Sequence, residues 1–235
     1  MNLSYNLSSM LRFPASPSEK VLRLAILECG QICYARNLMT SNDGNISVRL
    51  DKDRVLITSA GLSKGRMTDE DLLCIDLNGR VLETENGGRP SSETPMHLEA
   101  YRQRPDIRAI IHAHPIFATA LTVAGLDFPT DILPEVLLAL GEVPVSKYAT
   151  PSSDDDADAI RPLICEHNAI LLRQHGTLTV GVDLEEALIH LERVEHVAEV
   201  FWRARMLGHV EHLRSEARVR LLAVRDRNFK KNVAS

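Results

Sequence analysis

The sequence predicts an α/β fold of one domain and three layers, in which helices cover both faces of a mostly antiparallel central sheet. Short alternating segments are joined by tight turns, as in antiparallel hairpins. Longer segments with one apolar face lie before, between and after them, which predicts covering helices. No low-complexity linker interrupts the 235 residues. We therefore expect one domain over residues 16–208, with an N-terminal arm (1–15) and a C-terminal tail (209–235).

The first helix of the domain is predicted to begin at a capping box. Ser16 would be the N-cap, with Pro17 at the first helical position and Glu19 at the third. Apolar side chains then recur at helical spacing through residues 21–33. One face of this helix should therefore pack on the core.

Two hairpins follow the first helix. Residues 46–50 alternate as a strand should, and residues 54–58 read as the antiparallel partner across a short acidic turn. A second hairpin is centred on Asn78-Gly79, a pair that favours tight turns. Between the hairpins, Thr68 is predicted to cap a short helical turn.

Helices and strands alternate through the rest of the chain. The predicted elements are a helix over 92–103, a buried strand over 109–114, a short helix from 115, a further strand over 143–146, a helix within 151–167 capped by Ser or Asp, strands over 169–174 and 177–181, and a last long helix capped by Asp183 and ending near Leu207. His175-Gly176 interrupts the last two strands, and the glycine would let the backbone turn there. The basic segment beyond is expected to be a solvated helix end.

Composition excludes several classes of function. A net charge of −5 without a basic stripe argues against a nucleic-acid partner. No apolar run reaches the roughly 20 residues that span a bilayer, and no signal-peptide core is present near the N-terminus. The four cysteines form no disulfide framework, so a cytoplasmic location is expected.

Three histidines and one glutamate form a candidate metal site. His112 and His114 are two residues apart on a predicted strand, so their side chains share one face. His175 ends another apolar strand, and Glu93 lies at a loop-to-helix junction. Three imidazoles and a carboxylate suit Zn²⁺, or less tightly Mn²⁺, Co²⁺ or Fe²⁺, and three histidine ligands leave a position open for substrate. A lone H-x-H pair is a weak signal, since a buried histidine is more often a hydrogen-bonded core residue, but the combination is stronger.

The remaining histidines receive no role in the site. His97, one helical turn after Glu93, should lie near it with a supporting role at most. The others are expected on polar faces or, for His167, at a helix C-terminus. These others are His167, His190, His196, His209 and His212.

A second group of residues predicts an anion-binding site. Asn45 and Gly61 lie in turns where backbone N–H groups are accessible, and Ser91 and Ser92 precede a helix N-terminus. Each turn alone is ordinary. Their joint occurrence next to Glu93 favours a phosphate site.

These residues resemble the class II aldolase/adducin family. The matching stretches are "GNISVR", "LITSAGLSKGRMTDEDL", "RPSSETPMHLEAYRQRPDIRAIIHAHP", "VSKYAT" and "LLRQHGTLTVGVDLEEAL". The resemblance implies a metal ion on His112, His114 and His175, Glu93 as the acid/base, and substrate phosphate on Asn45, Gly61, Ser91 and Ser92. It implies that Tyr148 is a proton donor to a neighbouring subunit's site in a C4 homotetramer. The implied reaction is reversible cleavage of a ketose 1-phosphate to dihydroxyacetone phosphate and an aldehyde.

The sequence departs from the family pattern in two places. The loop T-P-[ST]-G reads "TSAG", so Ala60 lacks a hydroxyl that would contact phosphate. Lys64 or Arg66 could compensate, although surface charges are the simpler interpretation. The tail, residues 210–235, has no tyrosine, so Phe229 is the aromatic residue that could close the site. The missing tyrosine argues against fuculose and favours another aldehyde, such as a deoxy or methylthio one.

Other activities compete with the aldolase. A family epimerase would carry Asp at the position of Glu93, whereas a sugar-phosphate dehydratase would keep the Glu and three histidines and stays open. Family decarboxylases tend to replace the Ser-Ser pair, which disfavours them. An adducin-like interaction module would have lost the metal ligands. A cupin dioxygenase is discarded because its Glu follows the H-x-H pair.

Overall fold

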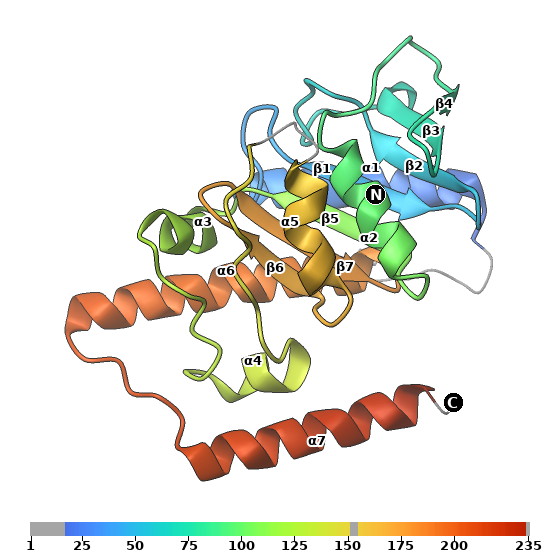
Figure 1. Cartoon of the computed structure of the whole chain (residues 1–235). Coiled ribbons are helices and arrows are strands. Elements are labelled where there is room, and N and C mark those ends of the chain that lie inside the picture. The colour runs from blue at the N-terminus through green and yellow to red at the C-terminus, as the bar shows by residue number, and fades with distance from the viewer. Residues whose placement is uncertain (1–16, 151–154, 234–235) are drawn as a thin grey trace, which may run out of the picture.

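Seven strands form the sheet at the centre of the computed structural model, which describes residues 17–150 and 155–233 (Figure 1). The strand order is β4-β3-β2-β1-β5-β7-β6, and every neighbouring pair is antiparallel. The strands are β1 (Asn45–Arg49), β2 (Arg54–Thr58), β3 (Leu72–Asp76), β4 (Val81–Glu83), β5 (Ala109–Ala113), β6 (Ala169–Leu172) and β7 (Gly176–Gly181). The predicted antiparallel sheet is confirmed.

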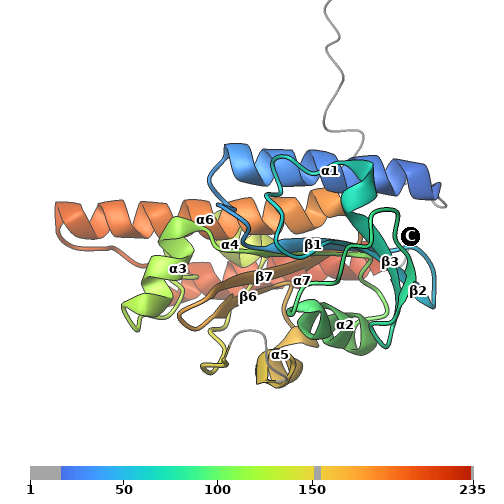
Figure 2. The ribbon, with the colours of Figure 1, turned by 90° about the horizontal axis from the view of Figure 1, so that it is seen from above.

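Helices cover both faces of this sheet, so the predicted three layers are confirmed. Figure 2 shows α1 and α6 on one face and α2 and α5 on the other. The helices are α1 (Glu19–Ala35), α2 (Thr94–Gln103), α3 (Ile116–Val123), α4 (Pro134–Ala139), α5 (Asp155–Ile164), α6 (Leu184–Leu207) and α7 (Ser215–Val233), with a 3₁₀ turn at Asp69–Asp71. The 3₁₀ turn is capped by Thr68 and α6 by Asp183, as predicted.

Strand alternation divides the core between the two faces. Leu56 and Ile111 pack with α1 and α6, whereas their neighbours Ile57 and Ile110 pack with α2 and α5. Successive strand residues point to opposite faces, so each strand contributes to both apolar layers. His112 follows the same alternation and shares the face of Ile110. The histidine therefore points toward the layer of α2.

The predicted start of the first helix and the predicted strand over 143–146 are both wrong. Helix α1 begins at Glu19, and its N-cap is Ser18, whose hydroxyl accepts a hydrogen bond from the Val21 N–H. The segment 143–146 forms only an isolated parallel bridge between Val145 and Leu171 instead of a strand. Pro144 has no N–H to donate to a ladder, which limits pairing there.

The basic segment of the C-terminal tail, predicted to be a solvated helix end, belongs to a separate long helix, α7. Helix α7 packs against α4, a helix that was not predicted, and Figure 1 shows the two side by side. The N-terminal arm (1–15), the predicted cap residue Ser16, the cap of α5 and the side chain of Phe229 lie outside the described residues. Among the described helices, none combines the length and apolarity needed to cross a membrane.

Candidate active site

The candidate ligands come together because β5 and β7 are neighbours in the sheet. His112 lies in β5, and His114 follows the end of that strand. His175 directly precedes β7, and the register pairs Ala113 with Thr177. The antiparallel pairing therefore brings His175 beside the end of β5, although more than sixty residues separate them in the sequence.

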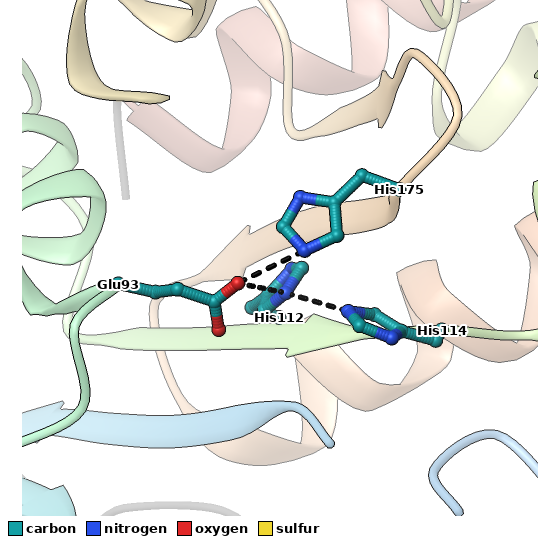
Figure 3. A group of neighbouring side chains, drawn as sticks. All are labelled: Glu93, His112, His114 and His175. Atoms are coloured by element: carbon teal, nitrogen blue, oxygen red, sulfur yellow. Dashed lines mark hydrogen bonds and ion pairs between the residues drawn. The ribbon is translucent and has the colours of Figure 1, made fainter. Parts of the chain in front are cut away.

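Four side chains converge there, and the ligand atoms that they offer all lie within 4.8 Å of one another (Figure 3). The Nε2 atoms of His112 and His114 are 3.0 Å apart. Glu93 Oε1 lies 3.3 Å from His112 Nε2 and 2.9 Å from His175 Nε2. Ligand atoms on a tetrahedral ion with bonds of about 2.0 Å are about 3.3 Å apart. The cluster therefore fits Zn²⁺ or a similar ion.

Hydrogen bonds orient two of the rings for ligation. His112 is fully buried, and its Nδ1–H donates to the Thr177 carbonyl oxygen at 2.9 Å. Its Nε2 lone pair is thereby directed at the cluster, which is the usual arrangement of a metal-binding histidine. His114 Nε2 also faces the cluster, while its Nδ1 lies 3.8 Å from Asp43 Oδ2.

The electrostatics of the cluster favour an ionised glutamate. Burial opposes the charged form of Glu93, but its close contacts with His112 and His175 outweigh the effect of burial and hold the pKa of Glu93 well below its usual value. Burial, followed by the charge of His112, lowers the pKa of His114 to about 3. His114 is therefore neutral at physiological pH, which is the form that binds a metal.

The turn that carries His175 is held by a left-handed residue and by close packing. Gln174 has φ of 56°, and its N–H donates to Thr122 Oγ1 at 3.0 Å. A Cβ at Gly176 would lie 2.3 Å from the Ala113 carbonyl oxygen. From the sequence, Gly176 was predicted to let the backbone turn here. In the structure Gln174 makes the turn, and Gly176 is needed because β7 passes so close to β5.

A cavity of about 300 Å³ opens in front of the cluster. The four predicted anion-binding residues line it together with Glu93, His114 and His175, and the full lining is Asn42, Asp43, Gly44, Asn45, Ser59, Ala60, Gly61, Lys64, Ser91, Ser92, Glu93, His114 and His175. Gly61 has φ of 76° and faces open space, so backbone can approach a ligand there. The structure thus brings both predicted groups of residues to one cavity.

Lys64 is a residue of the cavity that the sequence analysis treated as a surface charge. It is only 2 % exposed, and its ammonium group donates to the carbonyl oxygens of Asn42 and Leu62 at 3.0 and 2.7 Å. Burial lowers its pKa to about 8. Arg66, in contrast, is exposed. No periodicity around "GLSKG" distinguishes the two, because the burial of Lys64 depends on loops from elsewhere in the chain.

Two further predictions have different outcomes. Tyr148 is 60 % exposed and is absent from the described lining of the cavity. His190 was expected on a polar face, and this is wrong: it is 5 % exposed and its Nδ1 is 2.8 Å from the Val180 carbonyl oxygen. The long helix α6 packs this side against the sheet, so the histidine is a hydrogen-bonded core residue.

Comparison with known proteins identifies the family. The model of the class II aldolase and adducin N-terminal domain matches residues 24–202. The chain belongs to the class II aldolase/adducin family. The resemblance inferred from the motifs is therefore confirmed, and all four residues of the metal-type cluster lie inside the matched region.

Relatives within the family include decarboxylases and aldolases. A 3-oxo-tetronate 4-phosphate decarboxylase from Haemophilus influenzae is 33 % identical over 75 % of this chain and 85 % of its own length. An L-fuculose phosphate aldolase from Methanococcus maripaludis is 32 % identical over 72 % of this chain and 90 % of its own. The L-fuculose-1-phosphate aldolase structure from Thermus thermophilus is 34 % identical, with a TM-score of 0.69, over 79 % of this chain and 95 % of that one.

These family members are lyases, and this chain is an enzyme of the same family. Aldolases and decarboxylases both break a carbon–carbon bond and differ in the fragment that leaves. The interaction-module alternative is set aside, because the chain keeps the cluster of three histidines and Glu93.

Proposed function

We propose that the protein is a metal-dependent aldolase that reversibly cleaves a ketose 1-phosphate to dihydroxyacetone phosphate and an aldehyde. The observation that carries the proposal is a single cavity that joins a metal-type cluster to an anion-binding group. Its volume of about 300 Å³ suits a small phosphorylated sugar. All four cysteines are free, which supports a cytoplasmic location.

Substrate phosphate is assigned to the side of the cavity away from the histidines. Ser91 and Ser92 precede α2, where N–H groups and the helix dipole favour an anion. Asn45 and Gly61 offer an amide and an approachable backbone. Ala60 offers no hydroxyl, and the buried ammonium group of Lys64 compensates for its loss.

The cluster supplies the chemistry of bond cleavage. His112, His114 and His175 would hold Zn²⁺, with Mn²⁺, Co²⁺ or Fe²⁺ as alternatives, and the bound ion would stabilise the negative charge that develops as the C3–C4 bond breaks. In the condensation direction the ionised Glu93 removes the proton from the carbon that forms the new bond, and in the cleavage direction the resulting carboxyl returns that proton to the same carbon. Glu93 is suited to this because Asn45 donates to its Oε2 while Oε1 faces the histidines.

Tyr148 is assigned to the cavity of a neighbouring subunit. Its exposure of 60 % leaves it available to a second copy, in a C4 tetramer with sites between subunits. There it exchanges a proton with the aldehyde oxygen. Mixing Tyr148→Phe subunits with Glu93→Gln subunits tests this, because activity should return only if the two residues act from different chains.

Decarboxylation of a 3-oxo acid phosphate is the second candidate. It is favoured by the 33 % identity to the Haemophilus influenzae enzyme. Carbon dioxide would then leave in place of the aldehyde, and the same residues would stabilise and protonate the remaining fragment. The Ser91-Ser92 pair, which family decarboxylases tend to replace, keeps the aldolase as the first choice.

A coupled assay for dihydroxyacetone phosphate tests the proposal. The metal-loaded protein is given a panel of ketose 1-phosphates, with a chelator-treated sample as the control. Release that disappears on chelation would support the aldolase and identify the aldehyde. Absence of release with the ion bound would refute it, and carbon dioxide release from a 3-oxo acid phosphate would then support the decarboxylase. With neither product, a dehydratase or epimerase becomes the better assignment.

A further inference from the structure

A chain of buried polar side chains leads from Glu93 into the layer between the sheet and α2. Asn45 Nδ2 donates to Glu93 Oε2 at 2.7 Å, and Asn45 Oδ1 is 2.5 Å from His97 Nε2. His97 Nδ1 is 2.7 Å from Ser47 Oγ, which is 3.0 Å from the Tyr101 hydroxyl. The four residues behind Glu93 are at most 2 % exposed. Because these side chains are shielded from bulk water, a polar group in the wrong orientation could not form a hydrogen bond with water instead.

The direction of every hydrogen bond in this chain follows from the ionised carboxylate. Glu93 can only accept, so the NH₂ group of Asn45 must face it and the Asn45 carbonyl oxygen must face His97. His97 must then carry its proton on Nε2, which leaves Nδ1 to accept from the Ser47 hydroxyl. Ser47 in turn accepts from the Tyr101 hydroxyl at 3.0 Å, and the Arg108 carbonyl oxygen is a second, more distant acceptor for that hydroxyl at 3.4 Å. From Glu93 to Ser47, each donor meets one acceptor in a single arrangement.

His97 is held neutral, as this arrangement requires. Burial, followed by the charge of His112, lowers the pKa of His97 to about 3. A neutral ring has one donor and one acceptor, which are the two functions that Asn45 and Ser47 need from it.

Resting on the proposed function of Glu93 as the acid/base, we propose that His97 is a positioning residue that sets the orientation of the Asn45 amide. The oxygen and NH₂ ends of an asparagine amide are similar in shape, so hydrogen bonds decide its orientation. Without a second partner, Glu93 alone would have to select that orientation. His97 supplies that partner, since a flipped amide would place its NH₂ group against the Nε2–H. Asn45 therefore offers donors to Glu93 Oε2 and to Ser91 Oγ, the latter at 3.2 Å. Glu93 Oε1 is kept toward the histidines.

The arrangement also links the acid/base to the phosphate site. Both hydrogens of the Asn45 amide are engaged, one by Glu93 and one by Ser91. A phosphate that takes a hydrogen bond from Asn45 must displace one of these partners. His97 keeps the amide donating throughout this exchange, because the Asn45 oxygen stays paired with the ring.

Two substitutions at His97 separate positioning from packing. His97→Leu removes the ring donor and should lower kcat about 10- to 100-fold with the metal retained, the range found when a group that orients a functional residue is lost. His97→Gln keeps an N–H donor and should recover most of that loss. His190→Gln, at another buried histidine away from the cavity, is the matched control and should leave kcat unchanged. A folded His97→Gln protein as slow as His97→Leu would overturn the proposal.

A double-mutant cycle tests whether His97 acts through Asn45. In an Asn45→Ala background, His97→Leu should cause no further loss of kcat, because the orientation it controls no longer exists. Additive losses would show that His97 acts by another route and would contradict the proposal.

The tautomer of His97 can be measured without any assumption about the reaction. In ¹⁵N-histidine spectra of the metal-loaded protein, the signal missing from His97→Gln identifies the ring. It should show the neutral Nε2–H form from pH 5 to pH 8. A ring protonated on Nδ1 or charged in that range would overturn the proposal. If the tautomer is correct but no carbon–carbon cleavage is found, the proposed function fails while the hydrogen-bond arrangement stands.

Discussion

The two walls of the candidate active-site cavity are built in different ways. The histidine wall consists of His112, His114 and His175, which lie on or directly beside two neighbouring strands. The polar wall consists of Asn45, Gly61, Lys64, Ser91 and Ser92, which come from separate loops and strand ends. Glu93 lies between the walls and contacts both.

The histidine wall is determined by the spacing of residues along the sequence, whereas the polar wall depends on which side chains the fold buries. Strand geometry alone places His112 and His114 on one side, and a single strand pairing adds His175. The polar wall requires Lys64 and Asn45 to be enclosed by chain segments far away in sequence. Perturbing the histidine wall should therefore remove the metal, whereas perturbing the polar wall should change turnover or substrate affinity with the metal retained.

The largest effect is expected for the histidine wall. His114→Ala removes one of three imidazole ligands, so the protein should lose its metal and all measurable turnover. Metal content after gel filtration, measured by elemental analysis, checks this. His196→Ala is a matched control, since His196 is exposed on α6. Normal metal content in His114→Ala would remove His114 from the ligand set.

Glu93→Gln tests the residue that lies between the two walls. The amide keeps the shape of the side chain but cannot transfer the proton, so kcat should fall about 10²- to 10⁴-fold while the three histidines retain the metal. Turnover and metal content are measured on the same sample. Full activity in this variant would exclude Glu93 as the acid/base.

A smaller effect is expected for the polar wall. Lys64→Met removes a buried cation beside the substrate anion, so KM should rise about 10- to 100-fold with a smaller change in kcat, as for loss of one charge-assisted hydrogen bond. Steady-state kinetics check this, with Arg66→Met at the neighbouring exposed position as the control. Equal changes of KM in the two variants would show that Lys64 has a structural role and does not bind the substrate anion.

The smallest effect is a pH dependence of substrate affinity. Burial lowers the pKa of Lys64 to about 8, so the ammonium group is charged below that pH and loses its proton above it. KM should therefore rise between pH 7 and pH 9, a range in which the phosphate remains a dianion. In Lys64→Met the KM should be high and flat over the same range. A flat profile in the unmodified protein would show that the charge of Lys64 does not contribute to binding.

Much of this site could be predicted because its signals are local. The H-x-H pair on an apolar strand, His175 at a strand end and Ser91-Ser92-Glu93 before a helix each require only a few consecutive residues. The hairpins around residues 51–53 and Asn78-Gly79 are local in the same sense. Local spacing and turn chemistry thus sufficed for the three-layer fold, for the metal-type cluster and for the polar residues that share its cavity.

The remaining features were decided by tertiary structure. The sequence around Lys64 is that of an ordinary loop, and the lysine is buried because the segment of Asn42 folds over it. His97 contacts Asn45, which is 52 residues away in the sequence. The turn at Gln174 depends on Thr122 in another helix. Helix α7 carries many charged residues, and its place is set by packing on α4. The sequence by itself determined which groups can do chemistry, because side-chain type and spacing are local. The fold decided which of them are buried, paired and oriented, because burial depends on contacts between distant parts of the chain.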